Sequence, residues 1–190
     1  MHSYQLPDFP SDVSCVHAAL YTDVTDSDSL RKRLIAASTA EGSDGERERD
    51  AVNFAFIEAR LSQNNLRTKT VHSEIIWALN PSNNVIATLR ITEAMRRYGV
   101  SDSTTALVVV RVCGPQLLAE DVERGMDAIV HGNKVSFALL KDTTDWSAVK
   151  KYHKLGNEAG VRSLQGDPER ERVAIDGIVV SSVAMKSVMG

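Results

Sequence analysis

Short apolar stretches alternate along the chain with polar turn segments, and this pattern predicts strands interleaved with helices. Residues 13–21 are apolar and lie between Pro10 and an Asp/Ser/Thr cluster, which indicates a strand. Residues 106–112 are almost continuously apolar, as expected for a central strand that is covered on both faces. Further strands are predicted at residues 52–57, 73–79 and 135–140. The pattern therefore favours the α/β class, with a central mixed β-sheet flanked by helices.

Helices are predicted where apolar residues recur every three or four positions. A helix capped by Ser27 or Ser29 would place Leu30 and Leu34 on one face. Three more helices are predicted: residues 92–98, residues 118–130, and a helix that begins at a Thr144 cap. Between them, residues 38–50 are polar and rich in charge, which predicts a solvated, mobile loop.

The last segment has the clearest start signal for a helix. Asp167 can cap it, Pro168 suits its first turn, and Glu169 and Glu171 lie near the positive end of the helix dipole. Its apolar residues wrap around more than one face. They provide the candidate partner-binding residues Val173, Ile175, Ile178, Val179 and Val183. Two interpretations stay open, because surplus apolar surface on a helix can fill a core or bind a partner.

The length of 190 residues favours one domain that spans residues 1–190. The net charge of -3 excludes a protein that grips nucleic acid over its whole surface, so any such contact must be a local basic patch. Candidate phosphate-binding residues occur in small clusters, each of which can equally be an ordinary solvated face. The candidates are Arg67, Lys69, Arg96, Arg97, Lys150 and Lys151. Aromatic residues make up only 5% of the chain, which argues against a broad base-stacking platform.

The sequence contains no constellation that indicates catalysis or a cofactor. The five histidines lack metal-ligand spacing, and no nucleophile elbow, P-loop or dinucleotide-binding glycine motif is present. We therefore expect no catalytic residue, no metal and no cofactor. Cys15 and Cys113 are expected to be reduced core residues. With no secretory signal or apolar run long enough to span a bilayer, the nucleus or the cytosol is the expected location.

Several motifs in the right order resemble one known family. They are the segment 54–61 (FAFIEARL), the segment 66–76 (LRTKTVHSEII), Asn-Pro-Ser-Asn-Asn at 80–84, TEAMRRYGV at 92–100, the strand at 106–112, and VKKYHKL at 149–155. Any one of them is weak, but the combination is specific and covers most of the chain. It is similar to the PRPK-binding protein (TPRKB/Cgi) family, the accessory subunit of the KEOPS/EKC complex.

The resemblance implies a non-catalytic subunit that binds and regulates the atypical PRPK-type kinase/ATPase of the complex, through helices that include the last one. It implies an indirect link to the threonylcarbamoyl transferase subunit and the remaining KEOPS subunits. It also implies support for binding of the tRNA 3′ end, in the threonylcarbamoyladenosine (t6A) modification of tRNA. Linked roles in telomere maintenance and transcription place the expected location in the nucleus (chromosome, telomere) and the cytoplasm.

Two departures from the family pattern stand out. Family members carry a helix where only residues 62–65 separate Leu61 from Leu66, and residues 85–91 are extra. We hypothesise misassigned exon boundaries, which full-length transcript sequencing would test. The alternative function is a small-molecule-binding or enzymatic α/β domain, unrelated to tRNA modification, with its site at the strand ends.

Overall fold

A computed structural model describes residues 1–7, 9–61 and 99–186 of the chain. These residues form two compact units. Unit 1 holds the described residues up to 59 and those from 99 to 139, and unit 2 holds residues 60–61 and those from 140 onwards. Each unit is described by itself below. The strand predicted at 73–79, the helix predicted at 92–98 and the departures at 62–65 and 85–91 lie outside the described residues.

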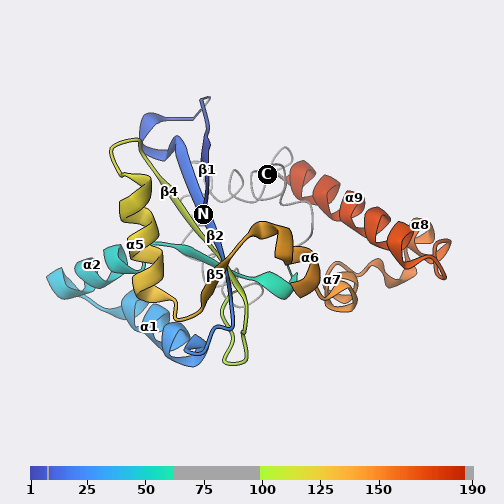
Figure 1. The fold of residues 1–190 in the computed structure, drawn as a ribbon, viewed down its shortest axis with the longest axis horizontal. Helices are drawn as coiled ribbons and strands as arrows, with labels where there is room; N and C mark the ends of the chain where they lie inside the picture. The colour runs from blue at the N-terminus through green and yellow to red at the C-terminus, as the bar shows by residue number, and fades with distance from the viewer. Residues whose placement is uncertain (8, 62–98, 187–190) are drawn as a thin grey trace. The chain divides into compact units, whose positions relative to one another are not determined.

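Unit 1 is built on an antiparallel sheet (Figure 1). Its strands are β1 (His2–Gln5), β2 (Cys15–Thr22), β3 (Ala55–Glu58), β4 (Leu107–Cys113) and β5 (Asn133–Val135). The order is β1-β2-β4-β3, and β5 pairs with the C-terminal end of β2. Every pairing within the described ranges is antiparallel. The predicted α/β class, with a central sheet flanked by helices, is confirmed.

Strands β2 and β4 form the centre of the sheet because their sequences suit burial on both faces. Leu107, Val108, Val109 and Val110 are all at most 1% exposed. Successive residues of a strand point to opposite faces, so this run needs cover on both sides of β4. The predicted central strand at 106–112 is thus confirmed to within one residue.

Three α-helices belong to the described part of unit 1: α1 (Ser27–Thr39), α2 (Gly42–Ala51) and α5 (Ala119–Ile129). Helices α1 and α5 cover one face of the sheet (Figure 1), where Leu30 of α1 and Met126 of α5 pack with Tyr21 and Val109 in one core. The predicted helix at 118–130 is confirmed.

The prediction of a mobile loop at residues 38–50 is wrong, because most of this segment is the helix α2. Two arginines tie this helix to α1. The Arg33 guanidinium lies 2.5 Å from a Glu48 carboxylate oxygen, and Arg49 donates to the Ala40 carbonyl at 2.6 Å. The charged run that indicated a solvated loop therefore supplies one cross-helix ion pair and one hydrogen bond to the end of α1.

Two smaller predictions also need correction, and one strand was not predicted. The strand predicted at 135–140 ends at Val135, and the chain continues as the 3₁₀ turn η4 (Phe137–Leu139) and the helix α6 (Leu140–Thr143). The residue at the start of the first long helix is Asp26 rather than Ser27 or Ser29. The strand β1, which the sequence did not predict, pairs with β2 at the start of the chain.

From residue 140 to residue 186, unit 2 is made of short helices and one long helix. After α6 come α7 (Trp146–Tyr152), the 3₁₀ turn η5 (Leu155–Asn157), α8 (Ala159–Arg162) and α9 (Pro168–Lys186). The cap of α7 is Asp145, which accepts from the Ala148 amide at 2.9 Å, and not the predicted Thr144. The Asp167 cap of the last helix is confirmed, because its carboxylate accepts from the Arg170 amide at 3.2 Å.

Candidate partner-binding surface

One face of α9 fills the interior of unit 2. Ile175 is 2% exposed and Val179 is 3% exposed. Both pack against Val149 of α7, Leu155 of η5 and Val161 of α8. Two of the five predicted docking residues therefore hold α9 on the helices that precede it, which is the core-packing interpretation for that face.

The opposite side of α9 is open. Val173 is 69% exposed, and Ile178 lies between the two faces, half-buried against the core. Val183 belongs to α9, but its side chain lies outside the described residues. A β-branched apolar side chain that is two-thirds exposed gains little from folding, so Val173 is the docking candidate that the structure leaves available.

A hollow of about 540 Å³ adjoins Val173 where α8 leads into α9, and we call it the α8–α9 hollow. It is lined by Leu164, Asp167, Glu169, Arg170, Val173 and Ala174. Its lining combines three apolar residues with three charged ones, and apolar and charged side chains also occur together in protein interfaces. The surface is therefore suited to an apolar side chain of another protein.

Charged and aromatic contacts hold this surface in place. Lys150 of α7 forms an ion pair with Glu171 of α9, and both side chains are about three-quarters buried. The Arg172 guanidinium lies 6.0 Å from the centre of the Trp146 ring. Both contacts join α9 to α7, in addition to the apolar core that Ile175 and Val179 form.

The two neighbouring lysines that the sequence analysis grouped together have different surroundings in the structure. Lys150 is engaged by Glu171, whereas Lys151 is exposed. A lysine whose charge is already neutralised by a carboxylate contributes less to the binding of a phosphate than an exposed, unpaired lysine does. The four remaining basic candidates, Arg67, Lys69, Arg96 and Arg97, lie outside the described residues.

Unit 1 holds a polar cluster that sequence reasoning missed. The Tyr21 hydroxyl donates to Asp127 at 2.6 Å, and Lys134 lies 2.7 Å from Asp127 and 2.6 Å from Glu123. Burial, together with the hydrogen bond to Asp127, raises the pKa of Tyr21 well above its usual range. Its members come from β2, α5 and β5, so no local spacing could have indicated the cluster.

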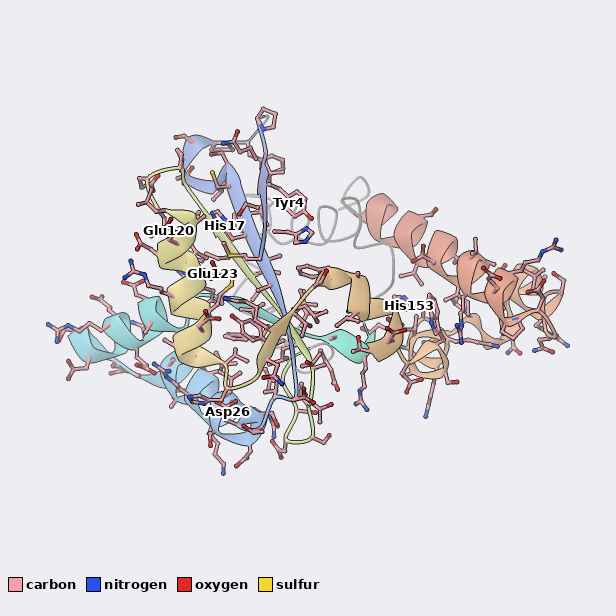
Figure 2. All side chains as sticks on the ribbon, viewed as in Figure 1. Tyr4, His17, Asp26, Glu120, Glu123 and His153 are labelled. Carbon is pink, nitrogen blue, oxygen red and sulfur yellow. The ribbon has the colours of Figure 1, made fainter. Side chains whose placement is uncertain are left out.

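The cluster around Tyr21 has a structural role, because it links side chains of β2, α5 and β5. Burial opposes ionisation of Asp127, but the hydrogen bonds from Lys134 and Tyr21 outweigh it and lower the pKa of that carboxyl. Figure 2 shows Glu123 on α5 beside the sheet. Each polar group has its partner within the cluster, so the arrangement fastens α5 to the sheet.

His17 is the buried histidine of the sheet (Figure 2). It is 6% exposed, and its Nδ1 lies 2.8 Å from the Ser3 hydroxyl. Burial lowers the pKa of this imidazole.

Across residues 1–61 and 99–186, residue 8 aside, no three His, Cys, Asp or Glu side chains are grouped so as to hold a metal ion. None of the helices described here is long and apolar enough to cross a bilayer.

These features describe an α/β protein that presents a long C-terminal helix with one face in a core and one face open. Comparison with known proteins identifies the family within this class. The family model described as kinase binding protein CGI-121 matches residues 60–187, which include all of α9. The chain belongs to this family.

Curated relatives from the same family align with this chain over nearly its full length. The chain is 30% identical to the EKC/KEOPS complex subunit CGI121 of Cryptococcus neoformans, and the alignment covers 100% of both proteins. It is 29% identical to the subunit of the same name from Neurospora crassa, over 98% of each chain. The corresponding subunit of Aspergillus fumigatus is 30% identical, over 98% of this chain and 96% of the relative. The predicted family is confirmed.

Proposed function

We propose that this protein is a non-catalytic subunit of an EKC/KEOPS complex that binds and regulates the kinase/ATPase subunit of that complex. Its family, and relatives named as subunits of that complex, support the proposal. Through that subunit it would associate with the threonylcarbamoyl transferase and the remaining subunits. It would support tRNA binding for threonylcarbamoyladenosine modification, with linked roles in telomere maintenance and transcription, in the nucleus and the cytoplasm.

The exposed apolar side of α9 is the observation that carries the proposal. Val173 stands in water beside the α8–α9 hollow, while the opposite face of the same helix is locked in a core by Ile175 and Val179. A partner that covers Val173 and fills the hollow would gain the free energy of removing this surface from water. Because α9 is already held by unit 2, docking there costs little ordering of the helix.

The test is a pull-down of the kinase subunit by the full chain. Val173→Glu places a charge on the exposed surface and is expected to weaken binding at least tenfold, because a buried unpaired carboxylate is costly. Its matched control is Ile35→Glu, which changes an apolar residue of α1 that is 48% exposed. Both variants are expected to melt like the wild type, since neither position is in a core.

Three results would count against this docking surface. One is normal kinase binding by Val173→Glu, and a second is equal loss of binding by Ile35→Glu. The third is loss of cooperative melting in Val173→Glu, which would make the position structural. Ile175→Glu is expected to unfold unit 2 and gives the reference for such a structural failure.

A further inference from the structure

The two cysteines of the chain lie directly opposite each other in the sheet. Cys15 opens β2 and Cys113 closes β4, and the antiparallel register pairs the two residues. Both are free thiols, 9% and 7% exposed, and both belong to the same core cluster. They are the only cysteines in the sequence, so neither has another partner within the chain.

The backbone ladder shows which way the peptide groups of Cys15 point. In an antiparallel sheet, alternate residues direct their N–H and C=O groups to alternate neighbours. The Leu6 amide donates to the Ser14 carbonyl at 2.7 Å, which continues the β1–β2 ladder. Ser14 therefore faces β1, and its neighbour Cys15 faces β4.

The same reasoning applies on the other side. The Ala59 amide donates to the Ala106 carbonyl at 2.9 Å, which continues the β3–β4 ladder. Even-numbered residues of β4 therefore face β3, and Cys113 faces β2. Cys15 and Cys113 thus form a hydrogen-bonded pair of the antiparallel ladder.

The register places Cys15 and Cys113 opposite each other, and a bond between their sulfurs requires their β-carbons, about 4.5–5.5 Å apart in such a pair, to approach to roughly 4 Å. The α-carbons of a hydrogen-bonded antiparallel pair are about 5.5 Å apart. Disulfides join residues whose α-carbons are roughly 4.4–6.8 Å apart. The pair is the last rung of the β2–β4 ladder, so the approach has to be accommodated only at one end of the ladder.

The resting state of the pair is the dithiol. Burial raises the pKa of the Cys113 thiol, and the neighbouring Cys15 raises it further. A protonated thiol is a poor nucleophile, so we expect this pair to react slowly with an oxidant.

We propose that Cys15 and Cys113 are an oxidation site that forms a reversible intramolecular disulfide when the protein meets hydrogen peroxide. One cysteine sulfur attacks a peroxide oxygen, the O–O bond breaks, and a sulfenic acid and one water form. The second thiol then displaces the sulfenic oxygen as a second water, and the S–S bond forms. The two sulfurs lose two electrons in total, which reduce one peroxide, and a dithiol reductant reverses the reaction.

The bond would join the N-terminal part of unit 1 to the strand that follows residues 62–98. It closes a long loop of the unfolded chain, and such a cross-link raises the melting temperature by restricting the unfolded state. Since β2 and β4 are already paired at this rung, the native fold need change little.

The test oxidises the reduced full-length protein with hydrogen peroxide, blocks the remaining thiols with N-ethylmaleimide, and digests it with trypsin without reductant. Mass spectrometry is expected to find the peptide 1–31 joined to the peptide 112–124, two hydrogens lighter than their sum. The oxidised protein is expected to melt several degrees higher, and a dithiol reductant should abolish both changes.

Cys15→Ser and Cys113→Ser are the controls, and each should melt at the same temperature with and without peroxide. The proposal is overturned if both wild-type thiols still react with N-ethylmaleimide after oxidation. It is equally overturned if oxidation stops at sulfinic acid on one residue, or if the cysteines link two chains in place of each other.

Discussion

His17 shows how a single buried residue ties stability to pH. Its imidazole lies in the sheet, is 6% exposed and contacts the Ser3 hydroxyl. Burial lowers its pKa in the folded state, so the folded state favours the neutral ring. In the unfolded chain the ring takes up a proton near pH 6.5, its ordinary value. Below that pH the unfolded state binds more protons, and stability falls as the pH falls.

We expect the free energy of unfolding to decline as the pH drops from about 6.5 towards the lowered pKa of His17. His17→Gln should flatten this part of the profile, because glutamine takes up no proton there. Urea unfolding at closely spaced pH values measures the effect. His2→Gln, at an exposed position of β1, is the matched control and should keep the wild-type slope. An unchanged slope in His17→Gln would refute the assignment.

At the scale of one element, two glycines in helices are expected to respond oppositely to the same change. A β-carbon added at Gly177 of α9 meets nothing within 4 Å, whereas one at Gly45 of α2 lies 2.5 Å from the Ala40 carbonyl oxygen. Glycine in a helix interior is destabilising by roughly 0.5–1 kcal/mol relative to alanine. Where space allows, alanine should recover this free energy, and where backbone is in the way it should cost more.

Gly177→Ala is therefore expected to stabilise the protein by about 0.5–1 kcal/mol. Gly45→Ala should destabilise it, because α2 must move away from the end of α1. Chemical denaturation of both variants and the wild type measures the change in the free energy of unfolding and so gives its sign. Equal effects of the two substitutions would mean that helix propensity alone, and not the close approach at Ala40, decides the outcome.

For the whole molecule, net charge limits how RNA can bind. With a net charge of -3, the protein has no overall attraction for a polyanion, so affinity must come from local cations. Lys151 is the exposed candidate in the described part of the chain, because Lys150 is held by Glu171.

Lys151→Ala is expected to weaken tRNA binding and to reduce the salt dependence of the binding constant by roughly one counterion. Lys32→Ala, which removes from α1 a lysine that is paired with Asp28 at 2.7 Å, is the control and should have little effect. Filter binding over a range of salt concentrations measures both the binding constant and its dependence on salt. If the two variants lose affinity equally, the interaction is non-specific and Lys151 does not mark a site.

Elements with strong local signals were predictable from sequence. The central strand β4, the helix α5 and the Asp167 cap of α9 each carry their signal within a few neighbouring residues. Elements that depend on distant partners were not. The helix α2 is polar and charged along its length, and it is held by contacts of Arg33 and Arg49 that no local pattern contains. The strand β1 is short and mostly exposed, and pairing with β2 is what makes it a strand.

The sequence by itself determined the family, the α/β class and the presence of a C-terminal helix with apolar residues on more than one side. These follow from local order: motifs, periodicity and capping residues are all readable along the chain. Only the tertiary structure decided that Ile175 and Val179 are core while Val173 stays in water, and that Cys15 faces Cys113. The physical reason is that burial and register are properties of pairs of elements, set by the helices that pack on α9 and by the ladder between β2 and β4.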